Sequence, residues 1–168
     1  LQNCHLQSCP NTGYMWNGIN LDYGGNLNCL NYDVCFFDAI KAVAIISGFT
    51  NSAELGGVTF DRCYIGIHFL YYNGLYPGQI IGCTFTSTGP LLAPYALLTR
   101  GYAGIDFHDV DDITIGSPAT TASGNTFNNL DYGIRAVHFS KITVFNNHFT
   151  NITTPYTCPF PSPCFTIP

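Results

Sequence analysis

Charged side chains are scarce in this chain: Lys, Arg, Asp and Glu make up only 9% of its 168 residues, against about 25% in an average soluble domain. Basic residues are the rarer kind, since five Lys and Arg stand against ten Asp and Glu and the net charge is −5. Recognition of nucleic-acid phosphates or anionic lipids depends on clustered positive charge. We therefore expect no nucleic-acid partner.

The sequence also lacks a long apolar run. A helix that crosses a bilayer needs about 20 consecutive apolar residues, and the longest run here, Ala39 to Phe49, is interrupted by a lysine, a serine and a glycine. We expect no membrane-spanning segment. The chain starts at Leu1 with no basic stretch leading into an apolar one, so we expect any secretion signal to have been removed or to lie outside these residues.

Cysteine, by contrast, is plentiful, with an even number of residues at high density for this length. Zinc sites use clustered Cys and His ligands, often in C-x-x-C pairs, and neither the cysteine spacings nor the five scattered histidines match that pattern. We expect no metal and no cofactor. Two interpretations stay open, disulfides of a secreted chain or reduced thiols in a core. The eight residues are Cys4, Cys9, Cys29, Cys35, Cys63, Cys83, Cys158 and Cys164.

The strongest positive signal is an internal repeat. A small residue, an isoleucine, a polar residue and an apolar or small residue occur in that order five times, starting at residues 18, 39, 66, 104 and 133. This alternation is typical of a strand with one buried face. It predicts one buried ladder formed by Ile19, Ile40, Ile67, Ile105 and Ile134.

Two further motifs complete the repeat. One appears as Gly57-Val58-Thr59-Phe60 and Gly124-Asn125-Thr126-Phe127, and the other as Ile113-Thr114-Ile115 and Ile142-Thr143-Val144. Three short strands joined by tight corners need about 21 or 22 residues, and equivalent positions then stack about 4.8 Å apart. The pattern predicts an all-β right-handed parallel β-helix of about five to six coils over residues 1–152.

Two other fold classes fit the sequence less well. A β-sandwich has strands about 8 to 12 residues apart without a shared motif, and the recurring tetrapeptide disfavours it. A helical domain is disfavoured by 17 Gly, 10 Pro and the absence of a sustained 3.6-residue period.

Residues 153–168 differ from the rest because they carry five prolines, which cannot continue a sheet. We expect a separate Pro/Cys-rich terminal loop or linker there. A disulfide between Cys158 and Cys164 would close it.

Alignment of the coils suggests two more bridges. It places Cys4 and Cys29 at similar points of one motif and Cys9 and Cys35 at the following corner. Residues stacked on adjacent coils lie within the Cα separation of about 4.4 to 6.8 Å that a disulfide needs. Oxidised cysteines would therefore pair as Cys4–Cys29 and Cys9–Cys35.

The run GNTFNNLDYGI over 124–134, continued by ITVFNNHF over 142–149, resembles the pectin-lyase-like right-handed parallel β-helices. The similarity is greatest to repeat segments of large secreted bacterial surface proteins, and it covers residues 1–152. It implies a secreted or cell-surface location. It does not select a function, because adhesins, tailspikes, lyases and hydrolases share this repeat and differ in their loops.

The longest interval between repeat copies holds an inserted loop, and insertions in solenoids map to one face that often binds ligands. Tyr95, Arg100 and Tyr102 in this insertion are our first candidates for ligand contact. Trp16 is another, as a sugar-stacking platform, with a core position as the alternative.

The enzyme hypothesis depends on one group of carboxylates, Asp106, Asp109, Asp111 and Asp112. Paired carboxylates can cleave glycosidic bonds, and clustered ones can hold calcium. The separated Asp motifs with Gly-His-Gly and Arg-x-Lys of polygalacturonase-type enzymes are absent. Asp106 shares one outward coil position with His68 and Arg135, so we expect it to be solvated and Asp106→Asn to change stability by less than about 0.5 kcal/mol.

These observations predict a non-catalytic structural or adhesive module of a secreted or cell-surface protein, able to form part of a longer chain. The alternative is a polysaccharide-active β-helix enzyme, a lyase or glycoside hydrolase. Expected partners are neighbouring domains of a longer chain, a cell-surface protein or glycans.

Overall fold

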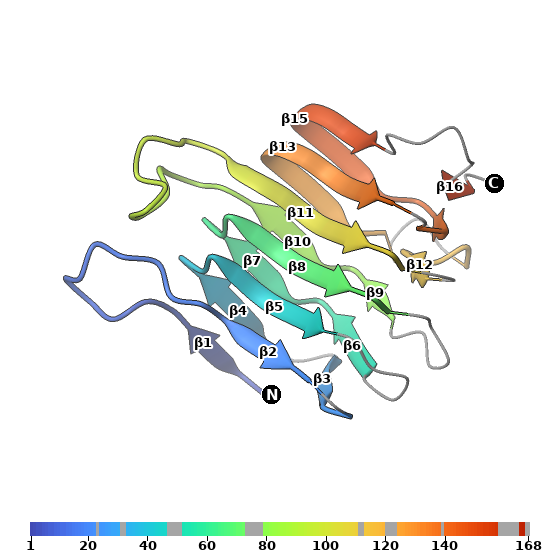
Figure 1. Cartoon of the computed structure of the whole chain (residues 1–168), viewed down its shortest axis with the longest axis horizontal. Helices are drawn as coiled ribbons and strands as arrows, with labels where there is room; N and C mark the ends of the chain where they lie inside the picture. Colours follow the sequence, from blue (N-terminus) through green and yellow to red (C-terminus); the bar gives the residue numbers. More distant parts are fainter. Residues whose placement is uncertain are drawn as a thin grey trace.

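The computed structural model describes residues 1–22, 24–30, 33–46, 52–72, 79–110, 113–119, 124–138, 140–157 and 165–166. Within these ranges the chain is all-β, and its parallel strands stack as a solenoid of about five turns (Figure 1). The predicted parallel β-helix is therefore confirmed. The described part contains no helix of the length and apolarity needed to cross a membrane.

Successive coils place their strands on three faces. The first face contains β1 (Cys4–Leu6), β4 (Val34–Phe37), β7 (Thr59–Asp61) and β10 (Thr84–Thr86). The second contains β2 (Ile19–Leu21), β5 (Lys41–Ile46), β8 (Ile65–Leu70) and β11 (Gly101–His108). Two long strands, β13 (Thr126–Val137) and β15 (His148–Thr157), run across both faces and join them into one sheet. The third face contains β3 (Asn26–Leu30), β6 (Ser52–Gly56), β9 (Ile80–Ile81), β12 (Ile113–Ile115), β14 (Ile142–Val144) and β16 (Phe165–Thr166).

A column of aromatic rings runs through the core below the first face. Its members occupy one register position on successive coils, with neighbouring ring centroids 4.8 to 5.2 Å apart. Each inner ring is therefore in contact with a ring above and a ring below, which buries a large apolar surface in a fixed geometry. The column consists of Phe36, Phe60, Phe85, Phe127 and Phe149.

A second column, of branched aliphatic side chains, follows the second face, and here the sequence prediction is wrong at one position. The strand register aligns Ile19, Val43, Ile67, Ile105 and Ile134. Val43 is fully buried, whereas Ile40 is half-buried and lies outside the column. The error is a shift of three residues. It arises because Ala39-Ile40 and Ala42-Val43 both place a β-branched residue directly after an alanine.

In three of the repeat copies, those of Gly66, Gly104 and Gly133, the opening glycine is required by the aromatic column. A Cβ built on Gly104 would lie 2.5 Å from Cδ1 of Phe127 and 2.8 Å from the carbonyl oxygen of Gly133. Gly66 has the same relation to Phe85, with a separation of 2.7 Å. The two sequence motifs are therefore coupled, since the phenylalanine of one fills the space that the glycine of the other leaves open.

The inserted loop before β11 contacts the N-terminal loop between β1 and β2. The amide of Met15 donates to the carbonyl of Ala93 at 2.8 Å, and the amide of Ala93 donates to the carbonyl of Gly13 at 2.9 Å. The two loops project from the same side of the coil stack, at the left of Figure 1. The insertion is thus tied to the first coil across the intervening ones.

Candidate functional site

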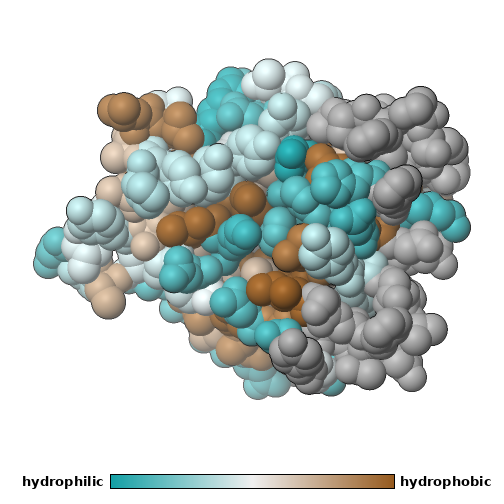
Figure 2. Space-filling view, viewed as in Figure 1, coloured by the Kyte–Doolittle hydropathy of each residue, from teal (hydrophilic) through white to brown (hydrophobic). Residues whose placement is uncertain are grey.

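The polar outer side of the second face is the candidate site, where β8, β11 and β13 lie side by side. This face is nearest the viewer in Figure 1, and Figure 2 shows hydrophilic side chains gathered over part of it between smaller apolar groups. The strand register places His68, Asp106 and Arg135 next to one another on consecutive coils. The predicted shared coil position of these three residues is therefore confirmed.

Asp106 is not solvated, which corrects the sequence prediction. Its side chain is 3% exposed, and both oxygens have partners. Oδ1 accepts a hydrogen bond from the guanidinium of Arg135 at 2.8 Å, and Oδ2 lies 3.2 Å from Nδ1 of His68 and 3.3 Å from Nε2 of His108. A short side chain on the outer face becomes buried here because longer side chains flank it on the adjacent coils.

The network keeps Asp106 ionised. Burial by itself would raise its pKa, but hydrogen bonds from His68 and Arg135, together with the charge of Arg135, outweigh that effect and hold the pKa below its ordinary value. The pKa of His108 is lowered, chiefly by burial and further by the charges of His68 and Arg135, against the opposing effect of Asp106. A carboxylate in this state cannot act as the proton donor of a glycosidase.

The same network already contains a cation, the guanidinium of Arg135, which disfavours a metal ion at this position. Donor atoms of His68, Asp106 and His108 lie within 4.8 Å of one another. However, Nη1 of Arg135 is 2.8 Å from Asp106 and 3.3 Å from Nε2 of His108. The guanidinium therefore already supplies the positive charge that this carboxylate binds.

A strip of tyrosines lies beside the charged network, on the same coils. Tyr95 stacks on Tyr64 with ring centroids 3.7 Å apart, Tyr64 stacks on Tyr102 at 5.2 Å, and Tyr102 meets Tyr132 edge-on at 5.3 Å. The guanidinium carbon of Arg135 lies 5.5 Å from the centre of the Tyr102 ring. All four rings are half-buried, so each presents part of its surface to solvent. We call these four residues the tyrosine strip.

Two members of the strip, Tyr95 and Tyr102, are sequence candidates, while Tyr64 and Tyr132 were missed. A signal for both is present in the sequence, because each is an aromatic residue close before a repeat glycine. Tyr64 stands two residues before Gly66, and Tyr132 stands one residue before Gly133. Burial raises the pKa of Tyr64 and Tyr102 above the ordinary value for tyrosine. Their phenols therefore stay protonated at neutral pH and can both donate and accept hydrogen bonds.

The side chains of Arg100 and Trp16 each form hydrogen bonds within the protein. Arg100 donates to the carbonyl of Asn151 at 3.0 Å and to its side-chain oxygen at 2.8 Å, which ties the insertion to β15. The indole N–H of Trp16 donates to the carbonyl of Phe37 at 2.7 Å, and its ring stacks on Phe36 at 6.5 Å. Trp16 is thus part of the core packing, as the alternative interpretation of this residue proposes.

The other three carboxylates of the enzyme hypothesis are Asp109, Asp111 and Asp112. Asp109 lies 3.1 Å from Nδ1 of the exposed His138. Asp111 and Asp112 lie outside the described residues.

The alignment behind the predicted disulfides is wrong, and the bridges Cys4–Cys29 and Cys9–Cys35 are not formed. All four residues are free thiols in the structure, as are the buried Cys63 and Cys83. Cys4 lies opposite Val34 on the first face, whereas Cys29 lies opposite Leu55 on the third. The predicted pair Cys158 and Cys164 lies outside the described residues.

Comparison of the chain with models of protein families, with curated proteins and with solved structures finds no match. The class defined by the structure is accordingly that of a parallel β-solenoid.

Proposed function

We propose that this chain is a non-catalytic, adhesive module of a secreted or cell-surface protein, and that it binds neutral glycans along the tyrosine strip. The repeat motifs that resemble pectin-lyase-like surface proteins support the location. The stacked, half-exposed row of Tyr95, Tyr64, Tyr102 and Tyr132 carries the proposal.

Tyrosine suits this task because its ring is apolar and its hydroxyl is polar. A pyranose ring presents a face of C–H groups to such a ring and hydroxyl groups around its edge. The strip offers several rings in succession. Tyr102 and Tyr132 lie on the paired strands β11 and β13, Tyr64 directly precedes β8, and Tyr95 of the inserted loop is held by its stacking on Tyr64. A rigid array of this kind loses little conformational entropy when it binds an extended ligand.

Charge favours a neutral ligand over an acidic one. The chain carries a net charge of −5, and Arg135, the cation that contacts the strip, is already paired with Asp106. An acidic glycan would therefore meet a negatively charged molecule whose cation at this position is occupied. The same pairing supports a binding role over a catalytic one, because Asp106 holds the network together and has no oxygen left for a substrate.

The test is calorimetric titration of the full chain with cellohexaose, xylohexaose, mannohexaose and hexagalacturonate. We expect binding of at least one neutral hexasaccharide, and Tyr102→Ala should weaken it by about tenfold or more, as truncation of a central aromatic contact does. Tyr71→Asn is the control. This tyrosine is 60% exposed but lies seven residues beyond Tyr64, about 23 Å along the strand direction.

Two results would overturn the proposal. The first is equal binding by wild type, Tyr102→Ala and Tyr71→Asn, which would place any glycan elsewhere. The second is cleavage of any of these glycans that disappears in Asp109→Asn, which would favour the polysaccharide-active enzyme instead.

A further inference from the structure

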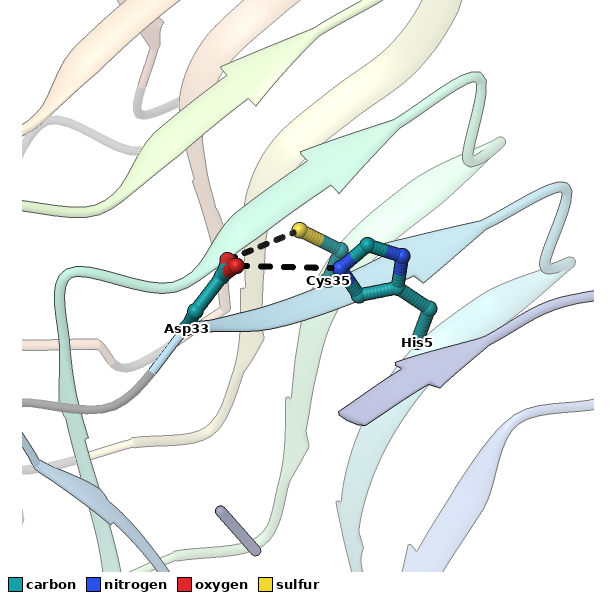
Figure 3. Close-up of side chains that lie close together, drawn as sticks. All are labelled: His5, Asp33 and Cys35. Carbon is teal, nitrogen blue, oxygen red and sulfur yellow. Dashed lines mark hydrogen bonds and ion pairs between the residues drawn. The ribbon is translucent and has the colours of Figure 1, made fainter. Parts of the chain in front are cut away.

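A second cluster of polar side chains lies on the outer side of the first face, at the first two coils, away from the tyrosine strip along the chain. It consists of His5 from β1, Cys35 from β4 and Asp33, which directly precedes β4 (Figure 3). The thiol of Cys35 lies 3.7 Å from Oδ1 of Asp33, and Nε2 of His5 lies 3.9 Å from Oδ2. Figure 3 shows all three side chains turned toward one another.

The backbone fixes this arrangement. His5 and Cys35 are direct partners in the parallel pairing of β1 with β4, and Asp33 and Cys35, two residues apart, project to the same side of the chain. The amide of Cys4 donates to the carbonyl of Asp33 at 3.0 Å, and the amide of Asp33 donates to Oδ1 of Asn3 at 3.4 Å. The three groups are thus held together by the coil stack even in the absence of a ligand.

The separations fit a small tetrahedral cation. With metal–ligand bonds of about 2.0 to 2.3 Å, two ligands of a tetrahedral ion lie about 3.3 to 3.8 Å apart. Sγ of Cys35 lies 3.7 Å from Oδ1 of Asp33 and Nε2 of His5 lies 3.9 Å from Oδ2 of the same carboxylate. One donor atom from each of the three residues lies within 4.8 Å of the other two, so the donors need to approach by up to about 1 Å to reach the tetrahedral spacing. Here, unlike at Asp106, no Arg or Lys of the described residues is paired with the carboxylate.

We propose that His5, Asp33 and Cys35 bind a zinc ion that clips the first coil of the solenoid to the second. One imidazole nitrogen, one carboxylate oxygen and one thiolate sulfur form a mixed donor set that suits Zn²⁺ and disfavours the hard cations Mg²⁺ and Ca²⁺. Water fills the fourth position, since the side chains of His5 and Asp33 are 57% and 77% exposed.

Binding replaces a proton by the metal. Cys35 is a thiol in the free protein, because burial and the neighbouring charge of Asp33 raise its pKa. Zn²⁺ displaces the thiol proton to solvent, the Zn–S bond forms, and one proton is released for each ion bound. The carboxylate that disfavours a free thiolate becomes a favourable ligand once the cation is present.

The site is tested with Co²⁺, whose bond to a thiolate gives a near-ultraviolet charge-transfer absorption band. We expect the full chain to show this band and Zn²⁺ to abolish it by displacement. Cys35→Ser should remove the band, and His5→Ala should weaken Zn²⁺ binding by about 100-fold or more, at least the effect of losing an outer-shell partner. Cys9→Ser, a change at an exposed thiol outside the cluster, should leave both measurements unchanged.

The clip role has its own measurement, hydrogen exchange of the β1 amides with and without Zn²⁺. Zn²⁺ should slow this exchange by about tenfold or more in wild type and leave it unchanged in Cys35→Ser. A cobalt band that persists in Cys35→Ser would overturn the site. Zinc binding at Cys35 without slower exchange in β1 would overturn the clip. Neither measurement involves a glycan, so the zinc proposal is tested independently of the proposed function.

Discussion

At the scale of single residues, Asp106 is the position where the structure changes the expected effect of a mutation most. The buried carboxylate has Arg135, His68 and His108 as partners, so Asp106→Asn leaves a partly buried guanidinium without its counter-charge. We expect the free energy of unfolding to fall by about 1.5 to 3 kcal/mol, the range for hydrogen bonds to charged groups. Urea unfolding followed by circular dichroism measures this.

Asp109→Asn is the matched control for Asp106→Asn. It makes the same chemical change at a carboxylate that also pairs with a histidine, but His138 is 57% exposed. Exposed pairs contribute less than about 1 kcal/mol. Equal losses in the two variants would show that the Asp106 network adds nothing beyond an exposed ion pair.

The sequence predicted the position of Asp106 but not its environment. Alternation along the strand puts it on the outer side of the coil, and the alignment of repeats correctly matches it with His68 and Arg135. The alignment does not take into account the size of the side chains on the two neighbouring coils. At a strand spacing of about 4.8 Å, a short side chain between an imidazole and a guanidinium is covered by both. An outward position is therefore not the same as an exposed one.

His108 should make stability depend on pH near neutrality. Its pKa is lowered in the folded chain, so below the ordinary histidine value of about 6.5 the unfolded chain binds more protons than the folded one. The contribution is complete above that pH and is lost as the pH falls toward the lowered pKa. We expect the free energy of unfolding to decrease from pH 7.5 to 5.5 less steeply in His108→Gln than in wild type. Identical slopes would contradict this account.

At the scale of the strand, the contact between Gly104 and Phe127 explains why the repeat begins with glycine. We expect Gly104→Ala to destabilise the chain by about 1 to 3 kcal/mol, the usual effect of overpacking, because the added Cβ would meet the ring at 2.5 Å. Gly89→Ala is the control, since a Cβ there would meet only Cδ of Arg62, at 3.7 Å. The midpoint of thermal unfolding of both variants tests the prediction, and equal midpoints would contradict it.

This coupling also accounts for what the sequence could and could not predict about the strands. Copies with both the glycine and the phenylalanine, such as those at Gly104 and Gly133, were aligned correctly. The second coil has alanine in place of glycine and Val43 in place of isoleucine, and there the alignment slipped to Ile40. Where alanine replaces the glycine, several small and branched residues satisfy the same packing, so the motif no longer identifies the position of the strand.

At the scale of the whole molecule, the free thiols report how the stacked coils open. Cys63 and Cys83 lie in the central coils, and burial raises the pKa of each to about 12. At pH 8 only about one such thiol in ten thousand is ionised, and the thiolate is the reactive form. Cys9, in contrast, is exposed.

We therefore expect iodoacetamide to modify Cys9 in the native protein while Cys63 and Cys83 stay unmodified until urea opens the core. Their coils pair directly, through β7 and β10, so the two should become reactive at the same urea concentration. Cys29 lies in the first coil, where β3 has a neighbour only on one side among the described strands, and should react at a lower one, because solenoid coils are stabilised by their neighbours. Mass spectrometry of the alkylated peptides measures all four. Separate transitions for Cys63 and Cys83 would mean that the central coils open independently, and simultaneous reaction of Cys29 with them would mean that the whole stack unfolds in one step.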